Sequence, residues 1–165
     1  EAAGAEALAM PCNTAHHFAP AIAAAARIPF IDMVGLSAKR MADLGARRVG
    51  ILASPAVRIA GVFERPFAEL GIEPLYCGRE DALLEAIRAV KVRRYEPARR
   101  TLAAAAADLA RAGADTLLVA CSEFSIITDA ARNVLPLADS IDVLAEEVVA
   151  FSSPPPGIAP GLATN

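Results

Sequence analysis

Two cysteines occupy matching places in the sequence, and their chemistry guides its interpretation. The stretch Met10 to His16 places Cys12 where an apolar run ends and helix-capping residues begin. The stretch Leu118 to Glu123 places Cys121 in the same way. A thiol at a strand-to-helix turn faces the positive end of the helix dipole, which lowers its pKa from a free value of about 8.5. Either cysteine is therefore a candidate base.

The residues before the two cysteines follow one pattern at a constant offset of 109 positions. Ala3 to Leu8 reads Ala-Gly-Ala-Glu-Ala-Leu, and Ala112 to Leu117 reads Ala-Gly-Ala-Asp-Thr-Leu. Self-similarity at a fixed offset indicates a duplicated structural unit. The sequence therefore predicts two related half-domains, each of which carries one cysteine.

Two thiols that face each other across a bound molecule can invert a carbon centre. One thiolate removes a proton from one face of the carbon, and the opposite thiol returns a proton to the other face. The alternative is that a free cysteine is a small buried hydrophobe, and we adopt this interpretation for Cys77. For Cys12 and Cys121 the matched placement favours the catalytic interpretation.

Composition limits the other function classes. The chain has 165 residues, is 55% hydrophobic and carries a net charge of −3 with both signs interspersed. No apolar run reaches the ~18 residues of a membrane span, and no basic stripe indicates a nucleic-acid partner. Three cysteines without zinc-like spacing indicate neither a disulfide framework nor a metal site. A cytoplasmic location is expected.

The chain begins with Glu1 rather than Met, and the first half is shorter than the second. If the halves match, about 65 further residues are expected before Gly4. We therefore expect that the first half-domain is truncated at its N-terminus.

Apolar runs alternate with amphipathic stretches, which predicts an α/β fold with parallel sheets and helices on both faces. The expected strands are 5–10, 28–31, 47–54, 72–76 and 116–120, and an apolar run at 134–137 precedes the last helix. The expected helices are 13–26, 37–44, 59–70, 80–90, 95–112 and 140–151, with a short helical piece from 122. The predicted domains are residues 1–45 plus 136–151, residues 46–135, and a disordered tail at 152–165. Ligands of such sheets bind beyond the carboxyl ends of strands, where both cysteines are expected.

The first motif, with Cys121-Ser122-Glu123, resembles the aspartate/glutamate racemase superfamily, most closely its aspartate racemase branch of broad amino acid racemases. The similarity covers nearly all of residues 4–151. It implies two pseudosymmetric flavodoxin-like or Rossmann-like domains with the active site between them, a homodimer, and catalysis without pyridoxal phosphate or metal. It also implies that Cys12 and Cys121 are the acid/base pair for an amino acid substrate. The residues expected near that substrate are Asn13, Thr14, Ser122 and Glu123.

Further site residues follow from the same resemblance. Lys91 lies 30 positions before Cys121, as a substrate-contacting lysine does in aspartate racemases, and it is a candidate for binding a side-chain carboxylate; the alternative is a solvated lysine. Ser54 stands where the family often has Thr. The loop 53–57 lacks the Gly and the second Thr that are usual there, so substrate identity stays open. Arg58 could bind a carboxylate or form a surface ion pair, and His16 could orient a loop.

Three other functions stay open. Relatives in the superfamily isomerise maleate or decarboxylate arylmalonates, although the decarboxylases use one cysteine. Hydantoin or glutamate racemisation would keep both cysteines. The chain could also be an inactive fragment or a binding-only paralogue.

Overall fold

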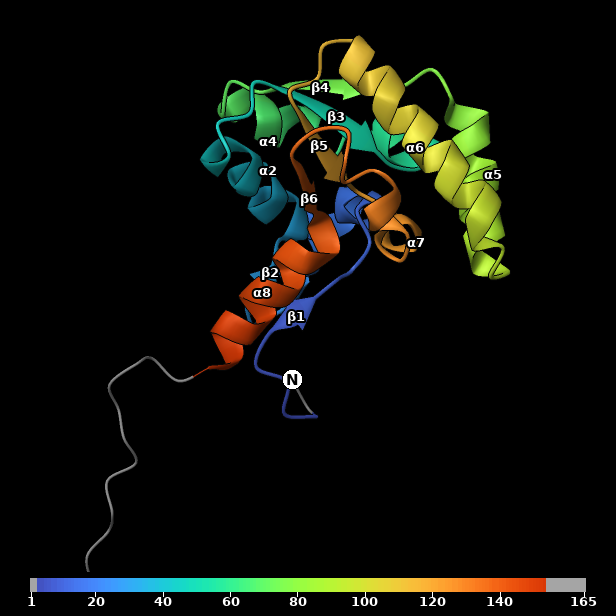
Figure 1. The fold of residues 1–165 in the computed structure, drawn as a ribbon. Helices are drawn as coiled ribbons and strands as arrows, with labels where there is room; N and C mark the ends of the chain where they lie inside the picture. Colours follow the sequence, from blue (N-terminus) through green and yellow to red (C-terminus); the bar gives the residue numbers. More distant parts are fainter. Residues whose placement is uncertain (1–2, 154–165) are drawn as a thin grey trace, which may run out of the picture.

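A four-stranded parallel sheet forms the centre of the larger part of the molecule (Figure 1). The computed structural model describes residues 3–153. The strand order is β4-β3-β5-β6. The strands are β3 (Arg48–Leu52), β4 (Glu73–Tyr76), β5 (Thr116–Val119) and β6 (Leu137–Asp139). Ile51 of β3 lies opposite both Tyr76 and Leu118, so the carboxyl ends of the three strands meet at one edge.

A second sheet carries the first cysteine loop. It consists of β1 (Leu8–Ala9) and β2 (Phe30–Ile31), which are parallel, with Leu8 opposite Phe30. The 3-10 helix η1 (Thr14–Phe18) and α1 (Ala19–Ala25) connect the two strands. The strand predicted over 5–10 is therefore shorter than expected.

Helices cover both faces of the four-stranded sheet because its buried strands are apolar on both sides. On one face, α5 (Glu80–Lys91) and α6 (Tyr95–Arg111) pack in one core cluster with Leu117. On the other face, α2 (Met33–Asp43), α3 (Pro55–Ala60) and α4 (Glu64–Glu69) share a cluster with Leu118. Neighbouring residues of a strand point to opposite faces, so Leu117 and Leu118 each anchor one helical layer.

A close helix-to-strand contact explains one glycine of β3. A Cβ atom at Gly50 would lie 2.8 Å from Leu117 Cδ2 and 3.0 Å from Leu109 Cβ. Glycine therefore allows α6 to pack directly on the sheet.

The remaining helices lie near the strand ends. They are α7 (Ser122–Ser125), the 3-10 helix η2 (Thr128–Ala130) and α8 (Ser140–Ser152). Figure 1 shows α8 running away from the four-stranded sheet toward β2, and Leu144 of α8 packs in a cluster with Ile31. The chain therefore passes from one sheet to the other where β6 ends and α8 begins.

Several predicted boundaries shift for local reasons. The helix expected over 59–70 is two helices, α3 and α4. Helix α3 begins at Pro55, because proline suits a first helical position. It ends just before Gly61, which adopts a left-handed conformation with φ of 62°. Helix α2 begins at Met33, ahead of the expected Ser37. It does so because the Asp32 side chain caps it by accepting from the Val34 N–H at 3.1 Å.

The predicted domain boundaries stay a prediction. Residues 137–139 pair with β5 in the four-stranded sheet, whereas α8 packs against α2 and β2. The predicted tail begins at Ser152, but Ser152 is the last residue of α8. Residues 154–165 of that tail lie outside the described residues.

The sequence repeat has a backbone counterpart. Gly4 and Gly113, the glycines of the two Ala-Gly-Ala triplets, both adopt left-handed conformations, with φ of 79° and 92°. At the same offset, β1 corresponds to the middle of β5, and a short helix follows each cysteine. The two cysteine loops therefore share the order strand, cysteine and short helix, although η1 begins two residues after Cys12 and α7 begins directly after Cys121.

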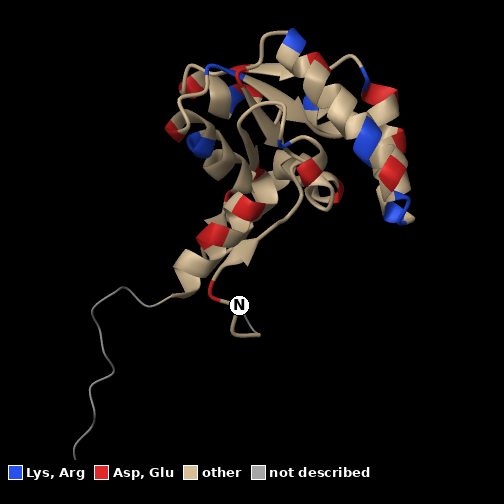
Figure 2. Cartoon of the chain, in the orientation of Figure 1, with Lys and Arg blue, Asp and Glu red and all other residues tan. Residues whose placement is uncertain are grey.

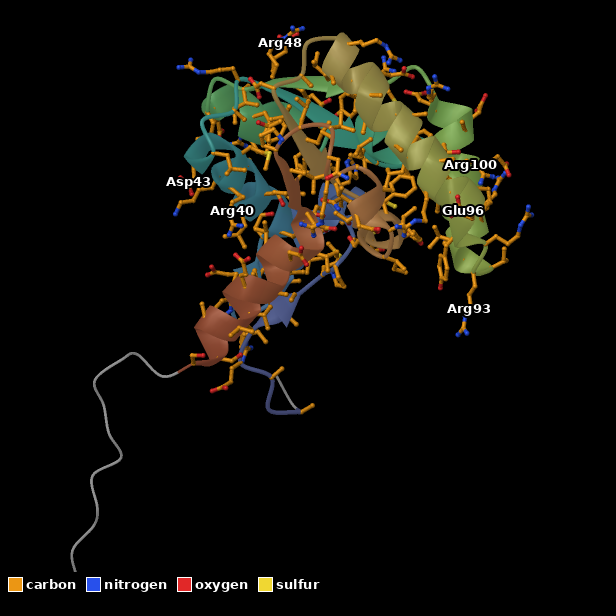
Figure 3. The ribbon with its side chains drawn as sticks, in the orientation of Figure 1. Arg40, Asp43, Arg48, Arg93, Glu96 and Arg100 are labelled. Atoms are coloured by element: carbon orange, nitrogen blue, oxygen red, sulfur yellow. The ribbon has the colours of Figure 1, made fainter. Side chains whose placement is uncertain are left out.

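Charged residues of both signs are interspersed over the surface (Figure 2). Figure 3 shows Glu96 and Arg100 together on α6, where the Arg100 guanidinium donates to the Glu96 carboxylate at 3.1 Å. Within residues 3–153, no helix has both the length and the apolarity that a membrane crossing requires.

Candidate active site

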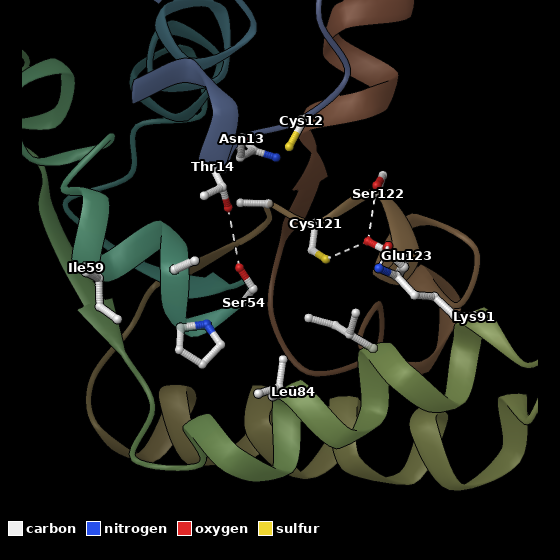
Figure 4. Close-up of a pocket in the computed structure, with 14 residues that line it drawn as sticks. Cys12, Asn13, Thr14, Ser54, Ile59, Leu84, Lys91, Cys121, Ser122 and Glu123 are labelled. Atoms are coloured by element: carbon white, nitrogen blue, oxygen red, sulfur yellow. Dashed lines mark hydrogen bonds and ion pairs between the residues drawn. The ribbon is translucent and has the colours of Figure 1, made fainter. Parts of the chain in front are cut away.

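One pocket brings together the eight residues that were expected in the catalytic and substrate-binding site (Figure 4). It has a volume of about 440 Å³ and lies beyond the carboxyl ends of β1, β3 and β5. The expected residues that line it are Cys12, Asn13, Thr14, Ser54, Lys91, Cys121, Ser122 and Glu123. Their roles toward a substrate stay a prediction.

Six further residues line the pocket, and all of them are apolar: Pro55, Ala56, Ile59, Leu84, Ile87 and Ala120. The sequence indicated which residues of α5 lie together with Lys91, because the spacing of Leu84, Ile87 and Lys91 places all three on one face of a helix. The pocket therefore has an apolar wall with one cation at its end.

Cys12 is exposed and lies in a tight turn. Its N–H donates to the Met10 carbonyl at 2.8 Å, and its own carbonyl accepts from Nδ1 of His16 at 2.8 Å. The backbone around Cys12 is thus held at both sides, while its thiol stays open to the pocket.

His16 has a structural role in this loop. The Met33 N–H donates to its Nε2 at 3.2 Å, so Nε2 carries a lone pair and Nδ1 carries the proton that goes to the Cys12 carbonyl. His16 is buried and does not line the pocket. It ties the Cys12 loop to the start of α2, in agreement with the expected orienting role.

Asn13 is 2% exposed and has one satisfied and one unsatisfied side-chain atom. Its Nδ2 donates to the Ser140 hydroxyl at 2.9 Å, whereas its Oδ1 is buried and has no hydrogen-bond partner among the described residues. Asn13 stands at the N-cap of η1 but makes no side-chain capping bond there. Leaving a buried acceptor without a partner costs about 1–3 kcal/mol. Asn13 Oδ1 is therefore a candidate to accept a hydrogen bond from a bound ligand.

Thr14 and Ser54 bring the two halves of the sequence into contact. Their hydroxyl oxygens are 3.5 Å apart, and either can donate. Thr14 follows β1 in the first half, and Ser54 follows β3 in the second. Two hydroxyl groups thus stand together in the pocket wall.

Cys121 is 9% exposed, and its thiol donates to Glu123 Oε2 at 3.2 Å. Burial, followed by this bond and the negative charge of Glu123, raises the pKa of Cys121 to about 12. The backbone N–H groups of Glu123 and Phe124 act in the opposite direction but do not prevail.

The expectation that a helix dipole lowers the Cys121 pKa is therefore wrong. Helix α7 has four residues, so its dipole is small, whereas the carboxylate lies in direct contact with the thiol. Cys121 is held as a thiol rather than a thiolate.

Glu123 connects Cys121 to Lys91. Its Oε2 accepts from Cys121 and from the Ser122 hydroxyl, each at 3.2 Å, and Lys91 Nζ lies 3.4 Å from its Oε1. Burial would raise the pKa of Glu123, but the hydrogen bonds from Cys121, its own backbone N–H, Ser122 and Lys91 together lower it. Glu123 is therefore ionised, and the Lys91 side chain, which is 63% exposed, balances its charge at the pocket rim.

Two other candidates lie outside the pocket. Arg58 donates to Glu80 at 2.7 Å and its guanidinium lies 5.8 Å from the centre of the Tyr76 ring, which fits the surface role of an ion pair. Cys77 is buried in the apolar cluster of α5 and α6, as a small hydrophobe would be. Among residues 3–153, no group of three or more His, Cys, Asp or Glu side chains could hold a metal ion.

The fold and the pocket define an α/β protein with paired thiols at strand ends, and comparison with known families agrees. Residues 1–148 match the family described as Asp/Glu/hydantoin racemase, and the chain belongs to that family. The resemblance inferred from the two cysteine motifs is thereby confirmed.

Solved structures agree with this assignment. An aspartate racemase from Picrophilus torridus is similar over 92% of this chain, with 26% identity and a TM-score of 0.81. An aspartate racemase homologue from Pyrococcus horikoshii (18% identity, TM-score 0.68) and a glutamate racemase from Bacillus anthracis (18%, 0.66) share the fold over 91% and 88% of the chain. The predicted α/β fold with parallel sheets is confirmed. The chain spans 64%, 68% and 57% of these three proteins.

Proposed function

We propose that the protein is a cofactor-independent amino acid racemase in which Cys12 and Cys121 form a two-base pair. The observation that carries this proposal is that both cysteines line one pocket while coming from equivalent loops of a repeated sequence. Figure 4 shows Cys12 on the loop after β1 and Cys121 on the loop after β5.

The environments of the two thiols suggest different starting roles. Cys121 is a thiol with a pKa raised to about 12, so it carries the proton that this proposal transfers to carbon. Cys12 is exposed and its thiol is open to the pocket, so it takes the role of the base in this proposal. In one direction, Cys12 takes the α-proton, the electron pair of that bond stays on carbon, and Cys121 gives its proton to the opposite face. The product is the mirror image, with Cys12 as a thiol and Cys121 as a thiolate.

The thiolate left on Cys121 needs stabilisation until the reverse reaction, or proton exchange with solvent, restores the starting protonation of both cysteines. The backbone N–H groups of Glu123 and Phe124, which already act to lower the Cys121 pKa, are placed to supply it. The apolar wall formed by Ile59, Leu84 and Ile87 excludes water, which strengthens these interactions during reaction.

Aspartate or a related acidic amino acid is the proposed substrate. Asn13 Oδ1, a buried acceptor without a partner among the described residues, fits a substrate ammonium group. Lys91 supplies a cation for a side-chain carboxylate at the far end of the pocket. The aspartate racemase of Picrophilus torridus, at 26% identity, supports the same choice. A homodimer is proposed from the family resemblance alone, and a cytoplasmic location is proposed from the cysteine content of the sequence.

Exchange of the α-proton with solvent tests the proposal directly. L-aspartate and D-aspartate are incubated in deuterium oxide with the full protein, and deuterium at the α-carbon is followed by NMR together with the enantiomer ratio. Deuterium is expected in the newly formed enantiomer. Glutamate and neutral amino acids in the same assay define the substrate range. Absence of exchange with every amino acid would reject the racemase proposal, and exchange with neutral substrates alone would reject the acidic substrate.

A further inference from the structure

The turn between β6 and α8 places two buried polar residues next to each other. Asp139 is 3% exposed and Ser140 is fully buried. Strand β6 belongs to the four-stranded sheet, whereas α8 packs against α2 and β2. Buried polar groups are retained where they form hydrogen bonds, so the partners of these two residues indicate what the turn holds in place.

Asp139 holds the helix that follows Cys121. One of its carboxylate oxygens accepts from the Ser125 hydroxyl at 2.8 Å and from the Ile141 N–H at 2.9 Å, and the other accepts from the Thr128 hydroxyl at 2.7 Å. Ser125 is the last residue of α7, and its N–H donates to the Cys121 carbonyl at 3.1 Å. The carboxylate therefore fixes the single helical turn that begins at Cys121.

Ser140 holds the other cysteine loop. Its hydroxyl oxygen accepts from Asn13 Nδ2 at 2.9 Å across 127 positions of sequence. Asn13 directly follows Cys12, and within residues 3–153 this is the one hydrogen bond that its side chain makes. Ser140 therefore sets the orientation of Asn13 and, through it, of the Cys12 turn.

We propose that Asp139 and Ser140 together form a positioning element that sets the two cysteine loops relative to each other. This inference rests on the proposed two-thiol racemisation. Neither residue lines the pocket, so each acts through a loop rather than on substrate. Two-base inversion requires both thiols at one carbon, and a displacement of about 1 Å can cost on the order of 10²-fold in rate. Consecutive residues in one rigid turn are suited to keep that geometry.

Thiol alkylation tests the positioning element without requiring catalysis. In the full protein, Ser140→Ala, Asp139→Asn and the control Ser37→Ala are treated with iodoacetamide, and each cysteine is followed by mass spectrometry. Ser37 is a matched control because it is fully buried and donates only within α2, to the Met33 carbonyl at 2.7 Å. We expect Ser140→Ala to change the alkylation rate of Cys12 and Asp139→Asn that of Cys121, each on the order of tenfold, since access and thiolate content set the rate.

Kinetics provide the second readout. Both variants are expected to lower kcat on the order of 10²-fold with little change in KM, and Ser140→Thr, which keeps the hydroxyl, should recover most of the loss. Because the equilibrium constant of racemisation is one, kcat/KM falls equally in both directions. Each cysteine removes the α-proton of one enantiomer, so displacing the Cys12 loop or the Cys121 loop slows proton removal from a different enantiomer. The primary kinetic isotope effect measured with α-deuterated substrate should therefore rise for one enantiomer in Ser140→Ala and for the other in Asp139→Asn. A folding defect alone would lower activity without this split.

The outcomes separate the two proposals. Alkylation rates and isotope effects equal to those of Ser37→Ala would overturn the positioning role even if racemisation is normal. Altered alkylation at the expected cysteines in a protein that exchanges no α-proton would reject the racemase proposal and retain the positioning role.

Discussion

The thiol of Cys121 donates to the carboxylate of Glu123 at 3.2 Å, so the two acidic groups of the pocket are in direct contact. Burial is the largest cause of the raised Cys121 pKa, and an ionised Glu123 in direct contact adds to it by making a second negative charge unfavourable. Lys91 balances Glu123 rather than Cys121. The pocket thus holds one ionised carboxylate, one cation and one protonated thiol.

Replacing Glu123 by Gln should lower the pKa of Cys121 below about 12, because the charge repulsion disappears while burial remains. The pH dependence of thiolate ultraviolet absorbance, compared between wild type and Glu123→Gln in the Cys12→Ser background, measures this pKa. Glu69→Gln is the control, since Glu69 pairs with Arg65 on the surface of α4. An unchanged or higher Cys121 pKa in Glu123→Gln would contradict the assigned cause.

The raised Cys121 pKa also predicts how stability depends on pH. In the unfolded chain a thiol ionises near pH 8.5, whereas in the folded protein Cys121 keeps its proton up to about pH 12. The stabilising contribution of the thiol is therefore complete below the unfolded pKa and is lost as pH rises through this window. The expected slope is about 1.4 kcal/mol of unfolding free energy per pH unit.

Denaturant unfolding of wild type and Cys121→Ser between pH 8 and pH 11 measures this loss, since serine does not titrate there. The stability of wild type relative to Cys121→Ser should fall as pH rises. Tyr76 titrates in both proteins, so the difference removes its effect. A constant difference across this range would show that Cys121 ionises equally in both states.

The repeated sequence pattern predicted the two pocket cysteines, and the family resemblance predicted the other polar residues of the pocket, but neither predicted the protonation of Cys121. Ser54 and Cys121 follow β3 and β5 of one parallel sheet, whose carboxyl ends lie together, so their convergence follows from topology. Cys12 follows β1 of the separate two-stranded sheet. The pKa of Cys121 depends on how deeply its loop is buried, which only tertiary packing sets. The bond between Ser140 and Asn13 likewise spans 127 positions, and no local pattern indicates it.

The two-base role predicts that both cysteines are required for racemisation. Cys12→Ser and Cys121→Ser should each lower racemisation by at least about 10²–10⁴-fold, because a hydroxyl is a far weaker base than a thiolate. Cys77→Ala is the matched control, since Cys77 lies in the apolar core outside the pocket. Chiral chromatography of product formed from each enantiomer measures the loss. Turnover near the wild-type rate in either serine variant would refute the pair.

Lys91 distinguishes an acidic substrate from a neutral one. Its side chain is mostly exposed and contacts Glu123 at 3.4 Å, so Lys91→Gln should change protein stability little. If Lys91 binds the side-chain carboxylate of the substrate, Lys91→Gln raises KM for aspartate on the order of tenfold or more and leaves KM for neutral amino acids nearly unchanged. If Lys91 only balances Glu123, all substrates lose kcat to a similar extent, because the change then acts through Cys121. Steady-state kinetics with aspartate and a neutral amino acid separate these outcomes. Lys39→Gln, on α2 and outside the pocket, controls for the loss of a surface charge.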